Sequence, residues 1–492
     1  MAIYIVAKDG SGNYSTIQQA VDVAIAGDTV QVKAGTYKEK ITITRSGSSG
    51  NYITFAAYPG QTAIVDGTGL VSQWDGIFTV KGASYIKISG FNILHSGYAG
   101  VRINGSGTSS NIIVEKNYFN DIYSSAMYTE NAGPGIIYDG NEVTVSHKAA
   151  MTTEGEVVDM VNVNGFEIKN NYIHDNVHAE SINAKIGSSN GKIHHNNIKP
   201  VESAGIYLDA WTGLEQNIEV YSNVVYDGVD ARGIAMAVEG GGTLRNIKVY
   251  NNIVYNNGQA GIIISHYDVC DPNSLCLSGI IDNIQIINNT TYNNNIRNYE
   301  WGGGIVNMPT YATNIVIRNN IASQNKITQI SVAGTSNIVQ NNLFDGVGSV
   351  IGSSYIIGNP QFINLANHDF HLTPGSLAID TGSSINAPTI DFDGKSRPQG
   401  AGIDIGAFEY VSACISVWRC ETDINGNKTG YEIDGCGNRR LNTALCSPTL
   451  KYKCINGTCV EDPTGTFTEP TCNNSCVPVC PTPVCDYIIK IL

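Results

Sequence analysis

A group of charged side chains near the middle of the chain has the residue types needed for acid–base chemistry and for binding a cation. The group comprises Glu154, Glu156, Asp159, Glu180, Lys185, Asp209, Asp230, Arg232 and Glu239. Acidic groups that point the same way supply the oxygen ligands that Ca²⁺ prefers. A lysine among them can act as a general base if burial or a cation lowers its pKa. We therefore expect the chemistry to lie within residues 154–211.

These residues sit on a repeating frame. The phrases at 165–173, 191–198 and 217–225 each alternate apolar and polar residues around an asparagine turn, which predicts short strands. From about Tyr52 onward the phrase recurs roughly every 20 to 40 residues, the period of a solenoid. It ends on Asn92, Asn117, Asn141, Asn171, Asn197, Asn223, Asn252, Asn289, Asn320 and Asn342. The repeat lacks helical segments, so we predict a β-solenoid of about ten rungs.

Stacking of the repeats decides which side chains meet. If successive repeats lie in register, Lys185 and Asp209 occupy equivalent places on neighbouring rungs, about 4.8 Å apart. Within one strand, Ile218 and Val220 should point into the solenoid, and Glu219 and Tyr221 should point out. The terminal asparagines are interpreted as a structural turn ladder that bonds to its own backbone.

Both ends of the chain differ from the repeats. Residues 1–45 are predicted to be a cap, with a short helix in 15–26 that has Ser15 as N-cap and Gly27 as its stop. Residues 46–410 form the solenoid, and 411–492 form a cysteine-rich tail. The last residues, 487–492, have the composition of an edge strand that caps the solenoid or pairs with another chain, so a homo-oligomer or head-to-tail assembly is one expectation.

Ten of the twelve cysteines lie in the tail, which predicts a disulfide framework in place of a hydrophobic core. They are Cys414, Cys420, Cys436, Cys446, Cys454, Cys459, Cys472, Cys476, Cys480 and Cys485. A zinc module is the alternative, although the tail has no histidine and no paired Cys-x-x-Cys spacing. Cys270 and Cys276 are expected to close one loop as a further disulfide. This pattern places the protein outside a reducing cytosol, as a secreted, cell-surface or virion protein.

Charge and hydropathy exclude other classes. The formal net charge is −14, which leaves no excess of lysine and arginine to bind nucleic acid. The same charge repels an acidic polysaccharide unless a cation bridges the two. No apolar run reaches the roughly 20 residues that span a bilayer. The first residues, 1–8, lack the basic start and long apolar stretch of a signal peptide.

Aromatic residues near the charged group suit the faces of sugar rings. Tyr207, Trp211, Tyr267, Tyr299 and Trp301 are expected near the site, and Arg232 joins Tyr207, Trp211, Tyr267 and Trp301 as candidates for substrate binding. Tyr226, Tyr255 and Tyr292 share one repeat position, three residues after the turn asparagine, and are interpreted as a stacking ladder instead.

The ends of the solenoid resemble a known group of proteins. The opening at 6–21 and 35–39 looks like the start of right-handed parallel β-helix proteins of the pectate-lyase superfamily. The segments at 358–362, 375–380, 391–398 and 404–409 resemble the terminal rungs of secreted members, so the resemblance covers about residues 1–410. The resemblance implies a right-handed parallel β-helix fold. It does not specify the reaction, because this fold hosts lyases, hydrolases, epimerases, esterases and tailspikes.

The stretches 180–185 and 205–211 resemble polysaccharide lyases in which a lysine base acts beside carboxylate-bound calcium. This resemblance implies that Lys185 is the base and that Glu156, Glu180 and Asp209 are calcium ligands. In such lyases the base removes the proton α to a uronate carboxylate, the cation stabilises the anion, and β-elimination cleaves the chain. Related sequences carry aspartates where this chain has Asn183 and Ile186, which is a departure in the expected metal site.

Three alternatives remain open from the sequence. In the first alternative, Lys185 and Asp209 have no catalytic role and form an exposed salt bridge that stabilises the fold by under about 1 kcal/mol. In the second alternative, the protein is a glycosidase that uses two carboxylates from among Glu154, Glu156, Asp159 and Asp209. The third alternative is a non-enzymatic glycan-binding or structural surface protein, such as a virion tailspike, an adhesin or a filament subunit.

Overall fold

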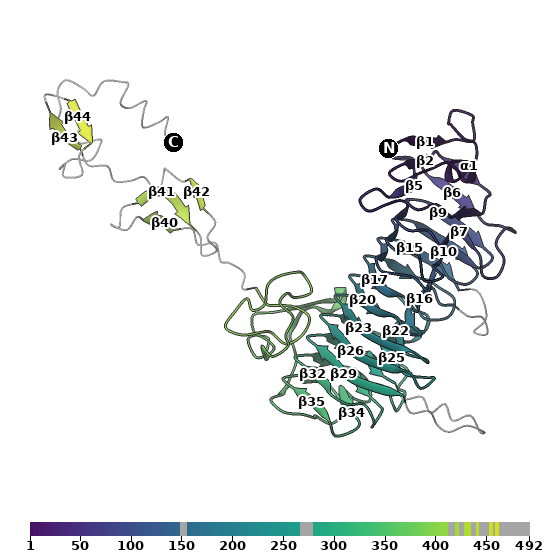
Figure 1. Ribbon diagram of the computed structural model, residues 1–492. Coiled ribbons are helices and arrows are strands. Elements are labelled where there is room, and N and C mark those ends of the chain that lie inside the picture. Colours follow the sequence, from purple (N-terminus) through teal and green to yellow (C-terminus); the bar gives the residue numbers. More distant parts are fainter. Residues whose placement is uncertain are drawn as a thin grey trace, which may run out of the picture. The chain divides into compact units, whose positions relative to one another are not determined.

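The fold is that of a computed structural model, which describes residues 1–147, 155–265 and 279–411 in full. Of the remainder it describes the backbone of five strands, β40 to β44. The chain divides into two compact units, Met1–Tyr410 and Val411–Leu492. The first unit is a right-handed parallel β-solenoid of about 11 turns, close to the ten rungs predicted from the sequence (Figure 1).

Three parallel sheets, named here A, B and C, form the walls of the solenoid. Sheet A stacks β1 (Ile3–Val6), β2 (Thr29–Val32), β5 (Ile53–Ala57), β8 (Ile86–Ser89), β11 (Ile112–Glu115), β14 (Ile136–Asp139), β17 (Asn164–Lys169), β20 (Ser189–His194), β23 (Leu214–Tyr221), β26 (Thr243–Tyr250), β29 (Ile280–Ile287), β32 (Ile315–Arg318) and β35 (Asn337–Gln340). Sheet B stacks β3 (Gly35–Tyr37), β6 (Ala63–Asp66), β9 (Asn92–Ser96), β12 (Tyr118–Ile122), β15 (Glu142–Ser146), β18 (Tyr172–His174), β21 (Asn197–Ile198), β24 (Val224–Tyr226), β27 (Ile253–Tyr255), β30 (Thr290–Tyr292), β33 (Ile321–Ser323), β36 (Leu343–Asp345) and β37 (Ile356–Ile357). Sheet C stacks β4 (Ile41–Ile43), β7 (Gly76–Lys81), β10 (Ala99–Asn104), β13 (Met127–Glu130), β16 (Val158–Val161), β19 (Ile182–Lys185), β22 (Glu202–Asp209), β25 (Asp230–Ala237), β28 (Ile262–Ile264), β31 (Ile305–Asn307) and β34 (Ile330–Val332).

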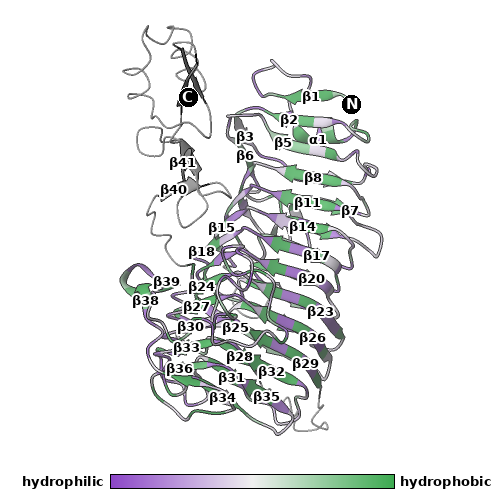
Figure 2. Ribbon diagram, turned by 90° about the vertical axis from the view of Figure 1, so that its left-hand side faces the viewer, coloured by the Kyte–Doolittle hydropathy of each residue, from purple (hydrophilic) through white to green (hydrophobic). Residues whose placement is uncertain are grey.

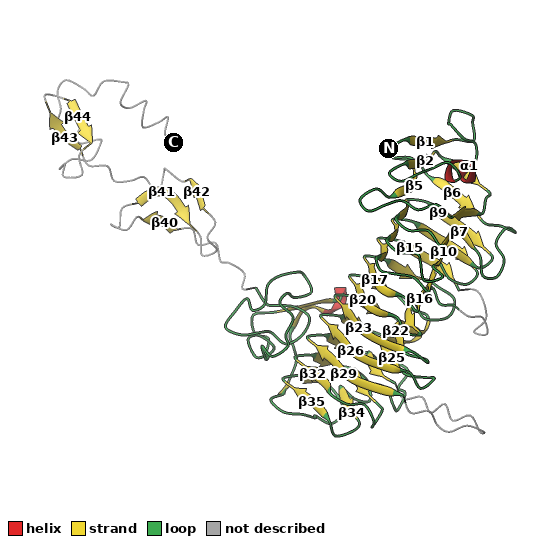
Figure 3. Ribbon diagram, viewed as in Figure 1, coloured by secondary structure: helices red, strands yellow, loops and turns green. Residues whose placement is uncertain are grey.

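Alternation along each strand determines the core. Ile218 and Val220 of β23 are fully buried, whereas Glu219 and Tyr221 are only partly covered, which confirms the predicted inside and outside positions. Every turn repeats this pattern, so apolar residues recur on strand after strand of sheet A (Figure 2). Strands and loops make up nearly all of the described chain, and its only helices are α1 and the 3-10 helix η1 (Figure 3).

A ladder of buried asparagine side chains runs along the turn between sheets A and B. In each step one asparagine Oδ1 accepts from the backbone N–H and the Nδ2 of the asparagine one turn before. For example, Asn223 donates both to Asn252 Oδ1, at 3.0 Å. The prediction of a structural ladder is confirmed, but two members were wrong. Asn196 stands in the ladder instead of Asn197, and Asn92 lies in β9, with the ladder beginning at Asn117.

The N-terminal end contains one short helix, α1 (Ile17–Val21), whose Ile17, Ala20 and Val21 are buried. Its N-cap is Thr16, whose side chain accepts from Gln19 N, and not Ser15 as the sequence indicated. The helix also stops earlier than predicted, at Val21, well before Gly27. No helix among the described residues is long and apolar enough to cross a membrane.

After the last turn the chain folds back on the outside of the solenoid. The returning segment contains β38 (Phe362–Asn364), η1 (Leu365–Asn367) and β39 (Asp369–Leu372). Phe370 and Phe408 pack against Tyr255, and Tyr226 stacks on Tyr255 at 5.4 Å between ring centroids. The predicted stacking is confirmed for Tyr226 and Tyr255. Tyr292, the third predicted member, lies opposite Tyr255 in the register, and its ring contacts Phe362 and Phe370 of the returning segment.

A buried ion pair anchors the returning segment. Arg397 Nη1 lies 2.6 Å from Glu409 Oε1, and neither side chain is exposed to solvent. Arg397 also donates to Asn251 Oδ1 at 3.1 Å, which ties the segment to the turn after β26. Because a buried charge needs a counter-charge and hydrogen-bond partners, this network holds the returning segment against the solenoid.

The second unit contains β40 (Arg419–Thr422), β41 (Lys428–Ile433), β42 (Arg439–Leu441), β43 (Tyr452–Ile455) and β44 (Thr458–Glu461). The ten tail cysteines, together with Cys270 and Cys276, either lie outside the described residues or have side chains that the structure does not describe. Their oxidation to disulfides therefore stays a prediction.

Candidate functional site

The outer face of sheet C brings the central charged residues together. Strand register places Lys185 of β19 directly opposite Asp209 of β22, as the repeats predicted. The neighbouring outward column runs through Asp159, Asn183 and Tyr207 on three successive turns. Because adjacent strands of a sheet lie about 4.8 Å apart, residues far apart in sequence become contact neighbours here.

Lys185 makes its ion pairs with the turn before it. Its ammonium lies 3.1 Å from Glu156 Oε1 and 3.3 Å from Asp159 Oδ2, and its side chain is only 14% exposed. The expectation of an exposed Lys185–Asp209 salt bridge was therefore wrong in both partner and burial. Burial alone would lower the pKa of Lys185, but the carboxylates of Asp159 and Glu156 outweigh it and raise that pKa. In this arrangement Lys185 is a cation.

Asp159 is the most enclosed carboxylate of the site. Its side chain has no exposed surface, and neither oxygen has a hydrogen-bond partner among the described residues. Burial raises its pKa, although the nearby Lys185 ammonium opposes this effect. An enclosed carboxylate of this kind is costly to keep, and the Lys185 ammonium is the main group that offsets this cost.

The side-chain carboxyl groups of Glu180 and Glu156 lie next to each other in the site. Burial in the first place, and next the adjacent Glu156 carboxylate, raise the pKa of Glu180 to about 8. Ser203 Oγ donates a hydrogen bond to Glu180 Oε1, which partly opposes this rise. Glu180 therefore carries a proton near neutral pH.

Asp209 meets further acidic groups on the following turn. Burial in the first place, and next the Glu239 carboxylate, raise the pKa of Asp209 to about 7. Tyr207 Oη donates a hydrogen bond to Glu239 Oε1, which orients this carboxylate toward the same face. Glu215, fully buried, also has a pKa raised well above its ordinary value by burial and by Asp209.

These groups surround one cavity of about 240 Å³. It is lined by His147, Glu156, Ala179, Glu180, Asn183, Lys185, Tyr207, Asp209, Trp211 and Glu239. Trp211 is 49% exposed at its edge. It packs over Gly240, where an added Cβ would lie 2.3 Å from the indole Cδ1. The cavity thus combines acidic groups, one ammonium and an exposed aromatic surface.

Six of the predicted site residues meet in this cavity: Glu156, Glu180, Lys185, Tyr207, Asp209 and Trp211. Two others, Arg232 and Trp301, do not line it. The Arg232 guanidinium lies 5.8 Å from the Trp301 ring centroid, and Tyr299 stacks on Trp301 at 5.1 Å. Tyr267 and Glu154 lie outside the described residues.

The cavity also contains Glu239, which the sequence placed in the charged group, and Asn183, which it named as a departure in the expected metal site, whereas His147 was not predicted. His147 Nε2 is 2.7 Å from the carbonyl oxygen of Gly155, and burial lowers the pKa of the imidazole.

The donor set agrees with the chemistry of a hard cation. Asn183 Oδ1 and Asp209 Oδ1 are buried and lack a hydrogen-bond partner, and carboxylate and amide oxygens are the ligands that Ca²⁺ takes. Among the described residues, no three His, Cys, Asp or Glu side chains are grouped as at a formed metal site. Calcium binding would therefore require the carboxylates to turn away from Lys185, and Glu180 to release its proton.

Comparison with known proteins agrees with the fold. Residues 131–273 match the family model described as a right-handed β-helix region. A curated relative, the uncharacterized protein YwoF of Bacillus subtilis (strain 168), is 24% identical over 291 residues. The alignment covers 52% of this chain and 60% of that protein.

Solved structures show the same architecture at low identity. XylC in complex with xylose is 13% identical, with a TM-score of 0.51, over 83% of this chain and 99% of that chain. Pectate lyase Pel9A is 17% identical, with a TM-score of 0.48, over 83% and 96% of the two chains. PfbA, a surface adhesin of Streptococcus pneumoniae, is 15% identical, with a TM-score of 0.48, over 66% and 83%. At 13% identity, the likeness to XylC shows the fold alone.

Proposed function

We propose that the protein is an extracellular, polysaccharide-active β-helix protein that cleaves a uronate-containing polysaccharide by β-elimination. The observation that carries the proposal is the position of Lys185, held by Glu156 and Asp159 at the wall of an acidic cavity with an exposed tryptophan. Aromatic surface beside polar groups suits a sugar ring, which has apolar faces and hydroxyl edges. The cysteine-rich tail supports an extracellular location.

Lys185 is the group proposed to move the proton. It takes the proton α to the uronate carboxylate, the double bond forms as the glycosidic C–O bond breaks, and Lys185 returns a proton to the leaving oxygen. This step requires neutral Lys185, whereas Glu156 and Asp159 hold it as a cation. Substrate binding must therefore weaken these two contacts before the reaction, because an ammonium without nearby carboxylates loses its proton more readily.

Calcium is the proposed cofactor, with Glu156, Glu180 and Asp209 as the residues that would hold it. When bound, such an ion neutralises carboxylate charge, including that of a uronate, and so stabilises the anion formed by proton removal. The buried oxygens of Asp209 and Asn183 that lack partners support this assignment.

The test is an ultraviolet assay for unsaturated uronate ends on a panel of acidic polysaccharides, with calcium and with a chelator. Lys185→Ala should lower the cleavage rate by the roughly 10²–10⁴-fold that one general base contributes. Lys38→Ala, at an exposed position of the first turns, is the matched control and should cleave like wild type. Asp209→Asn should lose activity that high calcium partly restores, whereas Lys185→Ala should not recover. Absence of cleavage by wild type on every uronate polymer at any calcium level refutes the lyase.

A second function is a glycan-binding surface without catalysis. The raised pKa of Lys185 favours it, since a lysine held as a cation binds anions but takes no proton. In that case Trp211→Ala should weaken retention of the protein on the polysaccharide, while Lys185→Arg should leave retention nearly unchanged. Cleavage that depends on Lys185 would decide against this second function.

A further inference from the structure

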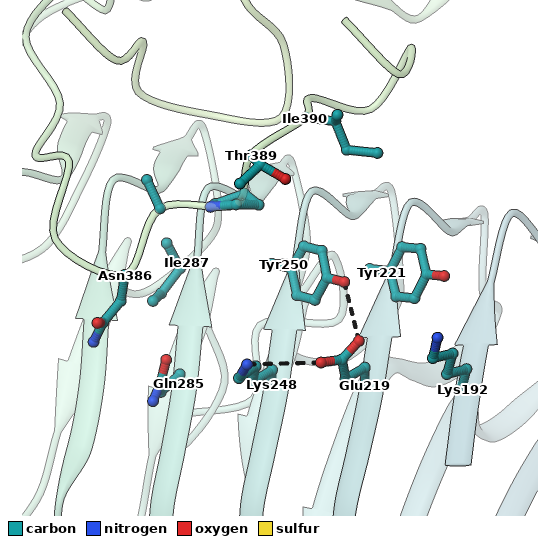
Figure 4. A pocket seen from close by; sticks show the side chains of 12 residues that line it. Lys192, Glu219, Tyr221, Lys248, Tyr250, Gln285, Ile287, Asn386, Thr389 and Ile390 are labelled. Atoms are coloured by element: carbon teal, nitrogen blue, oxygen red, sulfur yellow. Dashed lines mark hydrogen bonds and ion pairs between the residues drawn. The ribbon is translucent and has the colours of Figure 1, made fainter. Parts of the chain in front are cut away.

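A second cavity lies on a different wall of the solenoid, on the outer face of sheet A. Its volume is about 510 Å³, within the range of small-molecule sites. One side is formed by β20, β23, β26 and β29, and the other by residues 386–390 of the returning segment. Figure 4 shows this segment passing above the outward side chains of these strands. We call residues 383–390 the strap.

The strap is fixed to the solenoid on both sides of the cavity. At one end Asn319 exchanges two hydrogen bonds with Ser383, from its Nδ2 to the carbonyl oxygen at 2.8 Å and from Ser383 N to its Oδ1 at 2.9 Å. At the other end Asn251 Nδ2 donates to the carbonyl oxygen of Ile390 at 2.8 Å. The residues between these anchors bridge the outward face of β26 and β29, so the cavity has a preformed wall.

Two parallel tyrosine rings form the floor of the cavity. Tyr221 and Tyr250 lie on adjacent turns, with ring centroids 4.9 Å apart and ring planes 3° apart. Ile287 continues the same column on the next turn, and Pro388 of the strap lines the opposite side. The rings and apolar side chains provide a surface for the apolar face of a ligand, at low entropic cost.

Polar groups stand in the neighbouring column, where Lys192, Glu219, Lys248 and Gln285 follow each other on four turns. Glu219 is already engaged: it accepts from Tyr250 Oη at 3.3 Å and lies 3.6 Å from Lys248 Nζ. The backbone of Lys192 is paired within sheet A, but no hydrogen bond or ion pair joins its ammonium to another residue in the described part of the chain. Lys192 is therefore a free ammonium beside the tyrosine floor (Figure 4).

We propose that this cavity is a second binding site for an acidic saccharide, remote from the cavity of Lys185. The tyrosine floor takes the apolar face of one sugar unit, Gln285 and the Asn386 amide take its hydroxyls, and Lys192 takes the carboxylate. The inference rests on the proposed function for the ligand class, a uronate glycan. A carbohydrate bound at two places on one molecule is held longer than at either place alone, because the second contact is intramolecular.

The test is calorimetric titration with uronate trimers, of galacturonate, mannuronate and guluronate, and with a neutral xylose trimer as the uncharged control. Trp211→Ala removes the aromatic contact of the first cavity, so binding that remains in this variant reports the second. Adding Lys192→Glu to it should weaken that binding by about tenfold or more, since a hydrogen bond to a charged group is lost and a repulsion is added. Adding Lys38→Glu, the same charge change at an exposed position remote from the cavity, should leave it unchanged.

Two further results separate this site from the lyase. Lys192→Glu should cleave short uronate oligomers at the wild-type rate but should lose retention on long polymers. Wild type that binds the trimers but cleaves no polymer would refute the proposed function and leave the second site standing. Equal binding of acidic and neutral trimers, or equal affinity of the Trp211→Ala variant with and without Lys192→Glu, overturns the second site.

Discussion

The buried asparagine ladder allows the sharpest stability prediction, through the substitution Asn252→Ala. Asn252 is fully buried and stands in the middle of the ladder. Its Oδ1 accepts from Asn223 N and Asn223 Nδ2, both at 3.0 Å, and its Nδ2 donates to the carbonyl oxygen of Val220 at 2.9 Å. Asn252 Nδ2 also donates to the carbonyl oxygen of Tyr250 at 3.1 Å and to Asn289 Oδ1 at 2.9 Å. Alanine removes all five contacts, so each partner loses one hydrogen bond in the interior.

The expected loss follows from the buried groups that lose a hydrogen bond to the Asn252 side chain. A buried polar group that loses its partner costs about 1–3 kcal/mol, so values near the lower end give a total of about 3–6 kcal/mol. For cooperative unfolding of about 400 residues, an entropy of about 2.1 cal/mol/K per residue converts each kcal/mol into about 1 °C of melting temperature. Asn252→Ala should therefore melt several degrees below wild type in a thermal scan followed by circular dichroism.

The same turn offers a matched control. Asn246 belongs to an exposed asparagine row, donating to Asn217 Oδ1 at 3.1 Å and accepting from Asn283 Nδ2 at 2.9 Å. Its backbone has φ of 56°, which glycine adopts without strain, so Asn246→Gly tests the loss of the side chain alone. Because water replaces exposed hydrogen bonds, the loss should stay near 1 kcal/mol or less. Equal melting temperatures for Asn252→Ala and Asn246→Gly would refute the argument that burial makes the ladder essential.

Three further predictions concern the frame and the returning segment. Val220→Asp places a charge in the core and should lower the unfolding free energy by several kcal/mol. Glu219→Gln, on the outer face, should change the unfolding free energy by about 0.5 kcal/mol or less. Similar thermal shifts for the two variants would mean that the inside and outside positions are misassigned. Arg397→Met leaves Glu409 buried without its cation and should destabilise the first unit by about 3–5 kcal/mol. The double variant Arg397→Met/Glu409→Leu should recover part of this loss, because it no longer buries an unpaired charge. No recovery in the double variant would contradict a charge effect. Burial lowers the pKa of His371, but hydrogen bonds to Asp393 and Asp369 outweigh burial, so the pKa is raised overall. The contribution of protonated His371 to stability is therefore complete below about pH 6.5 and is lost as the pH rises through the raised pKa. Melting temperatures of wild type and His371→Gln should therefore converge on the alkaline side, and a constant difference across pH would show that the charge of His371 is irrelevant.

The fold could be predicted because its causes are local and periodic. Alternation of apolar residues, as in Ile218 and Val220, fixes the buried face of each strand, and the recurring asparagine fixes the turn. Stacking in register then placed Lys185 beside Asp209 correctly. The errors at Asn197 and Ser15 are shifts of a single position, where two similar residues adjoin and only the backbone geometry selects between them.

The partners of Lys185 could not be predicted in the same way. Its ammonium reaches back one turn, to Glu156 and Asp159, because a long side chain can lean along the stack as easily as across it. The sheet A cavity was equally inaccessible, since the strap meets Tyr250 only after the chain has folded back over the solenoid. Nothing in the composition of residues 383–390 indicates that contact.

The contrast between the ladder and the acidic cavity bears on whether the cavity is a site at all. Throughout the ladder, the buried side-chain amide of each asparagine donates a hydrogen bond to the side-chain oxygen of the asparagine on the next turn. Among the described residues, the only buried carboxylate oxygens without a hydrogen-bond partner belong to Asp159, Asp209 and Glu215, and the raised pKa of Glu215 traces in part to Asp209. Unsatisfied buried charge lowers stability, and native proteins rarely keep it without a use. Of these three residues, Asp209 lines the acidic cavity, where Asn183 Oδ1 is also buried without a partner and Trp211 is exposed. Open oxygen ligands beside an exposed aromatic surface are what the proposed binding of a cation and a sugar requires.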